Sequence, residues 1–125
     1  MNVDLENFRP NSVDEIIDVI GEEIGALGQK WWSVNSALVS GYLKSLAEAT
    51  IQTQISLSQK KITAAQADRI MHMQEVAFTS TLHFTKYMNF VLAQKVLDTT
   101  FKIIGWAIFN KTGINLFPQL VSTSS

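Results

Sequence analysis

Residues 63–109 contain no proline and only one glycine, Gly105. Apolar side chains recur through this stretch at steps of three and four residues, which is the spacing of one face of an α-helix. The pattern predicts one continuous helix, which at the usual rise per residue would be roughly 70 Å long. Because a rod of this length cannot cover its own apolar surface, the partners of the helix decide how the chain folds.

Two helix starts are marked by capping boxes, in which a hydroxyl side chain precedes a Glu or Gln by three residues. Thr63 and Gln66 open the long stretch, and Ser12 and Glu15 open an earlier one. Isoleucines follow Ser12 at helical spacing, with acidic residues mainly outside their stripe. This pattern predicts a short acidic helix over about 12–27.

A further helix is predicted over about 30–58, where apolar residues follow two neighbouring lines along one helical face. Residues 59–62 are the only plausible turn before the long helix. Because so short a connection makes consecutive helices antiparallel neighbours, 30–58 and 63–109 are predicted to form a long helical hairpin. The predicted fold is therefore all-α, without a β-sheet. Hydroxyl side chains near 79–83 indicate an alternative, in which a kink shortens the rod.

The chain is long enough for one domain with one core. Residues 1–11 are predicted to form an N-terminal arm, 12–110 a single helical domain, and 111–125 a C-terminal loop and tail. The N-terminus carries acidic residues instead of the basic and apolar segments of a signal peptide. We therefore expect cytoplasmic synthesis without a cleaved leader.

Charge is scarce and unevenly placed. Only 17% of the residues are charged, below the usual quarter, which favours burial in an assembly. Seven of the 11 acidic residues lie in residues 1–28, whereas the remaining chain is net basic, so the acidic part is expected to dock on the basic part of the same or another copy. The basic residues are dispersed, so no nucleic-acid partner is predicted.

Gly21, Gly25 and Gly28 leave two interpretations open. Small residues four positions apart let another helix approach closely. Alternatively, Gly25 and Gly28 fray and end the first helix, which is the favoured interpretation because glycine so often closes a helix. Trp31 and Trp32 are predicted to pack in a core or interface, with a ligand platform or an interfacial anchor as alternatives.

The sequence offers little that could carry chemistry. It has no cysteine, which excludes disulfides, thiolate metal ligands and cysteine nucleophiles. Asp68, His72 and Glu75 form an acidic cluster around a histidine at helical spacing, and such a group could bind a metal weakly or act as a general base. The cluster lacks a nucleophile and a second cluster to pair with, so a solvated helix face is preferred. No catalytic, metal-binding or cofactor-binding residue is predicted, and no cofactor.

The middle of the long stretch is rich in methionine and aromatic residues. Such a surface can serve adaptable binding, but packed core is the favoured interpretation because these residue types are commonly buried. The residues in question are Met71, Met73, Phe78, Phe84, Tyr87, Met88 and Phe90.

Residues 101–109 are apolar on nearly all sides and lie where the predicted hairpin runs out of cover from 30–58. Large uncovered apolar patches mark interaction sites, so we expect contact with another copy of the chain. A bilayer surface is the rival partner, because Trp106 lies between Lys102 and Lys111 in the manner of an interfacial anchor. The residues predicted to form the interface are Trp31, Trp32, Phe101, Ile104, Trp106, Ile108, Phe109 and Phe117.

Together these patterns predict a non-enzymatic, self-assembling helical structural or scaffold subunit, of the kind that builds a phage particle or a filament. The protein would be a homo-oligomer held by apolar helix contacts. A membrane-active helical protein, holin-like or pore-forming, is the second expectation. A small bundle that binds a metal or another ligand is the third.

Overall fold

The computed structural model describes residues 3–122. These residues contain no β-strand, so the predicted all-α class is confirmed. Residues 1–2 of the predicted arm and 123–125 of the predicted tail lie outside the described part. Within it, the elements are a short 3-10 helix, η1 (Leu5–Asn7), and four α-helices, α1 (Val13–Leu27), α2 (Gln29–Ser58), α3 (Ala64–His83) and α4 (Phe90–Thr112).

Both predicted capping boxes mark helix starts, but only the one at Thr63 forms both of its hydrogen bonds. The backbone N–H of Glu15 donates to the hydroxyl of Ser12 at 3.2 Å, which starts α1. The N–H of Gln66 donates to the Thr63 hydroxyl at 3.1 Å, and the N–H of Thr63 donates to the Gln66 side chain at 2.9 Å. Each bond satisfies a backbone donor that has no partner inside the helix, and this local chemistry is why these helix starts are readable from sequence.

The predicted single helix over 63–109 is wrong, because the chain leaves the helical path between α3 and α4. Tyr87 takes the left-handed backbone conformation, with φ of 63°, which a right-handed helix cannot contain. Asn89 then starts α4 by accepting a hydrogen bond from the N–H of Leu92 at 2.8 Å. The alternative kink near 79–83 lies closer to the observed break, which directly follows α3.

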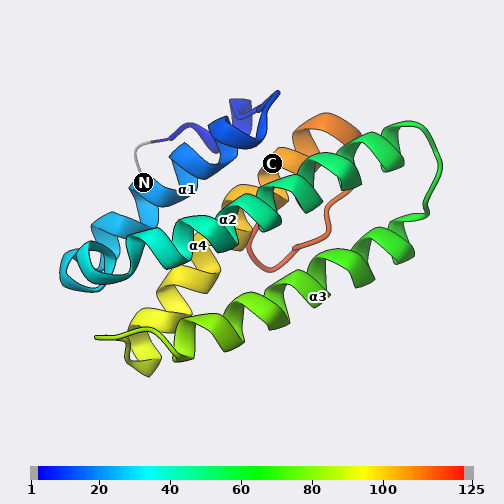
Figure 1. The fold of residues 1–125 in the computed structure, drawn as a ribbon. Coiled ribbons are helices and arrows are strands. Elements are labelled where there is room, and N and C mark those ends of the chain that lie inside the picture. The colour runs from blue at the N-terminus through cyan, green and yellow to red at the C-terminus, as the bar shows by residue number, and fades with distance from the viewer. Residues whose placement is uncertain (1–2, 123–125) are drawn as a thin grey trace.

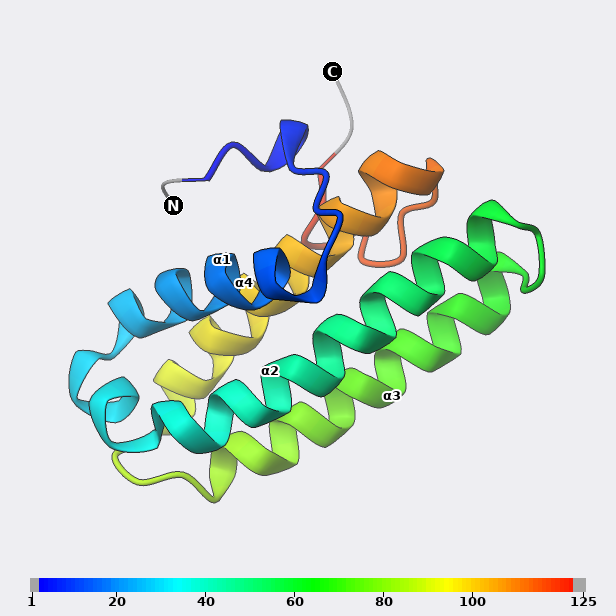
Figure 2. The ribbon, with the colours of Figure 1, turned by 45° about the horizontal axis from the view of Figure 1, so that its top comes forward.

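Figures 1 and 2 show α2 and α3 side by side and antiparallel, as predicted for consecutive helices joined by a short turn. The second arm of that pair ends at His83 instead of Phe109, and α4 turns back to contact α1, α2 and α3. Because α4 meets three helices, most of its length is covered. Its buried residues are Ala93, Val96, Leu97, Thr100, Phe101, Ile103, Ile104, Gly105, Trp106, Ala107 and Ile108.

Helix α1 packs on α2 and α4 through its isoleucine stripe. The indole of Trp32 lies against the glycines of α1: a Cβ on Gly25 would stand 3.0 Å from the Trp32 ring, and one on Gly21 would stand 3.6 Å from it. The close neighbour of these two glycines is therefore an indole side chain and not another helix backbone, and only Gly25 is in tight contact with it. The predicted fraying at Gly25 is wrong, since α1 continues to Leu27 and ends at Gly28.

The two ends of the described chain pack on the second half of α4. The side-chain amide of Asn110 donates to the backbone carbonyls of Leu5 and Phe8, at 2.8 and 2.9 Å, so the predicted N-terminal arm is fixed to its own chain. The segment after α4 crosses Gly105 so closely that a Cβ there would stand 2.6 Å from a methyl group of Val121. Glycine at this position is what allows the segment to lie on the helix.

Candidate functional site

Most of the residues predicted to form an interface lie inside the monomer. The uncovered helix end that motivated that prediction does not exist, because α4 folds back under α1 and α2. Of the predicted set, Trp32 and Phe109 are half-buried. The others are at most 8% exposed, and they are Trp31, Phe101, Ile104, Trp106, Ile108 and Phe117.

The strongest candidate for a contact surface is instead the end of the bundle where α3 connects to α4. Phe84 is 88% exposed and Phe90 78% exposed, values far from those of a core aromatic residue. In both Figure 1 and Figure 2 this connection lies at the same end of the bundle as the junction of α1 and α2. We call this surface the aromatic end, and define it by Leu27, Phe84, Tyr87, Phe90 and Val91.

The aromatic end is held in place by buried polar contacts beneath it. The indole N–H of Trp31 donates to the hydroxyl of Thr85 at 2.8 Å. The side chain of Asn35 donates to the carbonyl of Lys86 at 2.8 Å and accepts from its N–H at 3.2 Å. These bonds fix the connection to the first turns of α2, so Phe84 and Phe90 protrude from a supported backbone. A preformed surface loses less conformational entropy on binding than a mobile one.

Two lysines lie at the aromatic end. The ammonium group of Lys30 lies 4.3 Å from the ring centre of Tyr87, a cation–π contact between α2 and the connection. Lys95 lines an open hollow of about 540 Å³ together with Leu27, Phe90 and Val91. Neither residues 24–47 nor residues 76–97 contain an Asp or a Glu.

The sequence pattern identifies these aromatic residues but assigns them to the wrong environment. Phe84, Tyr87 and Phe90 belong to the methionine-rich and aromatic stretch for which packed core is the favoured interpretation. All three are exposed, whereas Phe78 and Met71 of the same stretch are buried. Exposure does not divide the stretch by sequence position, because Met73 is also exposed and Met88 is half-buried against the core.

The cluster of Asp68, His72 and Glu75 is a second candidate site. The Nε2 atom of His72 lies 3.2 Å from a carboxylate oxygen of Asp68, and Nδ1 lies 3.0 Å from one of Glu75. Nε2 is also 3.3 Å from the carbonyl oxygen of Leu116, and the imidazole ring lies 4.8 Å from that of Phe117. The two acids therefore bind opposite edges of the ring and do not face a common point.

These distances give His72 a structural role, in which the imidazole joins α3 to the segment after α4. Within residues 3–122 no three His, Asp or Glu side chains are arranged to hold a metal ion. The predicted solvated helix face agrees with the exposed carboxylate of Asp68. It does not include the contact between His72 and the carbonyl of Leu116. That contact joins residues 44 positions apart, so helical spacing alone gives no sign of it.

Opposing effects act on the pKa of His72. Burial of the ring lowers it, but the hydrogen bond with Glu75, the charge of Asp68 and the carbonyl of Leu116 raise it more. The net result is a pKa above the usual 6.5. His72 therefore binds a proton more tightly in the folded chain than in the unfolded chain, and protonation stabilises the fold.

We expect the stabilising contribution of His72 to be fully present below pH 6.5 and lost as the pH rises through the higher folded-state pKa. The side chain is 43% exposed, so solvent screening keeps the effect small. Urea unfolding should be compared between the native chain and His72→Gln, below pH 6.5 and about two pH units higher. The difference in unfolding free energy should shrink at the higher pH. A difference independent of pH would contradict the role given to His72.

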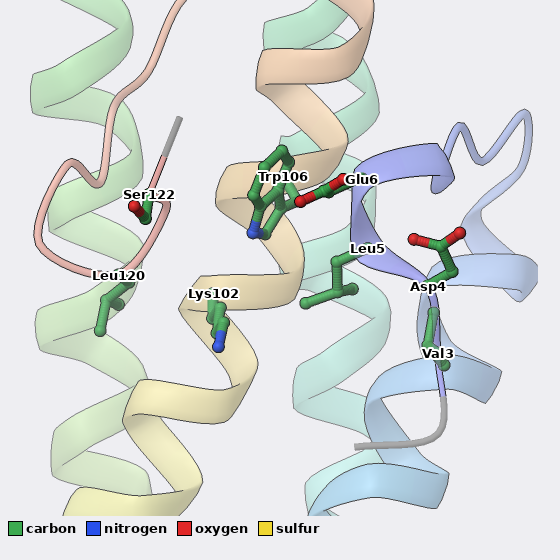
Figure 3. A pocket seen from close by; sticks show the side chains of 8 residues that line it. All are labelled: Val3, Asp4, Leu5, Glu6, Lys102, Trp106, Leu120 and Ser122. Atoms are coloured by element: carbon green, nitrogen blue, oxygen red, sulfur yellow. The ribbon is translucent and has the colours of Figure 1, made fainter. Parts of the chain in front are cut away.

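A second hollow, of about 390 Å³, lies between the two ends of the described chain and α4 (Figure 3). Its walls include Leu5 and Glu6 from the N-terminal segment, Lys102 and Trp106 from α4, and Leu120 from the C-terminal segment. In Figure 3, Leu5 points toward α4, and the carboxylate of Glu6 lies beside Trp106. The hollow adjoins the packing of the chain ends and brings together no set of groups suited to catalysis.

None of the helices within residues 3–122 combines the length and the apolar character that crossing a bilayer requires. Comparison with known proteins gives no further guide, because no protein family, no curated protein and no solved structure matches this chain.

Proposed function

We propose that the protein is a non-enzymatic helical structural or scaffold protein that attaches to a partner surface through the aromatic end. The observation that carries this proposal is the exposure of Phe84 and Phe90, 88% and 78%, on a connection held by buried hydrogen bonds. Aromatic side chains gain free energy when they leave water, so a cluster of exposed aromatic residues marks a contact surface. The proposal keeps the structural role expected from the sequence but moves the contact surface.

The test compares native protein with Phe84→Ser/Phe90→Ser. Retention on a phenyl matrix measures apolar contact whatever the identity of the partner. The double variant should lose most of the contact that the native protein makes, because its two most exposed aromatic rings are gone. Circular dichroism confirms that the fold is kept, which is expected because substitutions at exposed positions change stability little.

Met73→Ser/Val76→Ser is the matched control. These two residues of α3 are 71% and 68% exposed, so a similar amount of apolar surface is removed at a different place. If the two double variants lose contact equally, or if neither loses any, the aromatic end is not the attachment surface and the proposal is wrong.

A second candidate function is the self-assembly of a phage-particle or filament subunit through helix contacts. The observation that favours it is an exposed stripe along α2, where Val34, Leu38 and Tyr42 are 50%, 56% and 37% exposed. No charged residue occurs between Trp31 and Leu43, so another helix could lie on this stripe without burying a charge. Under this function, Leu38→Lys should reduce the assembled mass seen by light scattering, whereas Phe84→Ser/Phe90→Ser should not.

A further inference from the structure

We infer that the partner surface of the aromatic end is an anionic lipid bilayer. This inference rests on the proposed function, and it names the partner that the charge and shape of the aromatic end fit. The proposed bilayer contact lies at the N-terminal end of α4. The sequence pattern instead indicates a membrane contact around Trp106, near the other end of that helix. Trp106 is 8% exposed and packs in the core, so it is not free to enter a bilayer.

The apolar part of the aromatic end consists of a few exposed side chains. Phe84 and Phe90 flank the connection between α3 and α4 and expose 88% and 78% of their surfaces, with Val91 exposed by 63% beside them. A few protruding apolar side chains on a supported backbone can enter the headgroup region while the rest of the bundle stays in water. Tyr87 adds an aromatic ring with a polar tip, the type of side chain enriched at the membrane–water interface.

Three lysines accompany that apolar part. Lys30, Lys86 and Lys95 are all exposed, and each lies within the segments that lack acidic residues. The nearest acids along the chain are Glu23, Glu75 and Asp98, outside those segments. Lysines near an anionic membrane surface contribute attraction individually. A stable but reversible attachment combines such basic residues with a modest apolar insertion, and the aromatic end has both.

The charge pattern also distinguishes a bilayer from a second copy of the chain. In a symmetric dimer the same patch faces itself, so the lysines of the two copies would approach each other. Like charges brought together at an interface disfavour association. An anionic lipid surface instead presents many negative groups to all three lysines at once, with apolar chains beneath them for Phe84 and Phe90.

Co-sedimentation of the full chain with vesicles tests the inference. One vesicle preparation holds phosphatidylcholine alone and the other holds phosphatidylcholine with phosphatidylglycerol. We expect binding to the anionic vesicles and little to the neutral ones. Phe84→Ser/Phe90→Ser should weaken binding by at least about tenfold, because the inserted apolar area is lost. Lys86→Gln and Lys95→Gln should each weaken it about fivefold, and added salt should weaken it as well.

Met73→Ser/Val76→Ser is again the control, and it should bind like the native chain. Equal binding to both vesicle types, or no binding to either, would overturn the inference of an anionic bilayer. If vesicle binding is absent but the phenylalanine double variant still loses retention on the phenyl matrix, the aromatic end contacts a partner other than lipid, and the proposed attachment function stands without the lipid partner. If neither measurement depends on Phe84 and Phe90, the proposed function fails as well.

Discussion

Replacing Trp31 with alanine is expected to lower the free energy of unfolding by about 3–5 kcal/mol, the usual cost of removing a large aromatic side chain from a core. Trp31 is 1% exposed and joins the start of α2 to the connection between α3 and α4. Its removal leaves a cavity, and it also leaves the hydroxyl of Thr85 without the N–H that donates to it. Urea unfolding followed by far-UV circular dichroism measures the loss without relying on tryptophan fluorescence.

Thr85→Val separates the hydrogen bond from the packing. This change keeps the shape of the side chain but leaves the buried indole N–H of Trp31 without an acceptor, which costs about 1–3 kcal/mol. The expected order of stability is therefore native chain, Thr85→Val, Trp31→Ala. A loss below about 1 kcal/mol for Trp31→Ala would show that Trp31 does not hold the core together and would reopen an interface role for it.

Phe101→Ala is expected to destabilise the fold by a similar amount, about 3–5 kcal/mol. Phe101 is fully buried on α4, and its ring centre lies 6.3 Å from that of Phe78 on α3 and 5.4 Å from that of Phe117 in the C-terminal segment. One side chain thus connects three parts of the molecule. Chemical denaturation gives the loss directly, and the transition midpoint should fall to a lower urea concentration.

Phe90→Ala is the matched control, because Phe90 lies on the same helix and is 78% exposed. We expect it to change the unfolding free energy by no more than about 0.5 kcal/mol, as at other exposed positions. The two phenylalanines then differ in role: Phe101 stabilises the fold, whereas Phe90 contributes little to its stability. Equal destabilisation by the two substitutions would contradict the placement of α4 in the core.

The parts of this fold that are predictable from sequence are those set by local chemistry. Ser12 and Thr63 act on backbone donors three residues away, so the starts of α1 and α3 follow from the residues themselves. The turn between α2 and α3 is likewise too short to allow anything but antiparallel neighbours. Helical spacing of apolar residues then gives the all-α class.

The break between α3 and α4 is harder to predict, because its causes are partly distant in sequence. Locally, Thr79 and Thr81 donate to the carbonyls four residues earlier, and Asn89 caps the next helix, so these residues indicate a break. The helical periodicity of apolar residues continues on both sides of the connection, however, and favours one uninterrupted helix. The hydrogen bond that holds the connection joins Trp31 to Thr85, 54 positions away, and helical periodicity in the sequence cannot indicate it.

The candidate site depends entirely on that break. With a straight helix, Phe101 would stand uncovered beyond α2, and Phe84 would lie in the middle of the hairpin. With the break, Phe101 returns to the core and Phe84 moves to the end of the bundle. Both are phenylalanines on the same apolar stretch, so only the tertiary fold determines which of them meets solvent.

The bonds from Asn110 to Leu5 and Phe8 span 105 and 102 positions and tie together segments from nearly opposite ends of the chain. Contacts between residues so far apart carry a large loop-closure cost, so they form late in folding, after the helices have assembled. Contacts absent from the folding transition state govern how fast a protein opens. Asn110→Ala should therefore speed unfolding and leave the folding rate nearly unchanged in stopped-flow measurements. We therefore expect the attachment of the N-terminal arm to α4 to slow the unfolding of the chain.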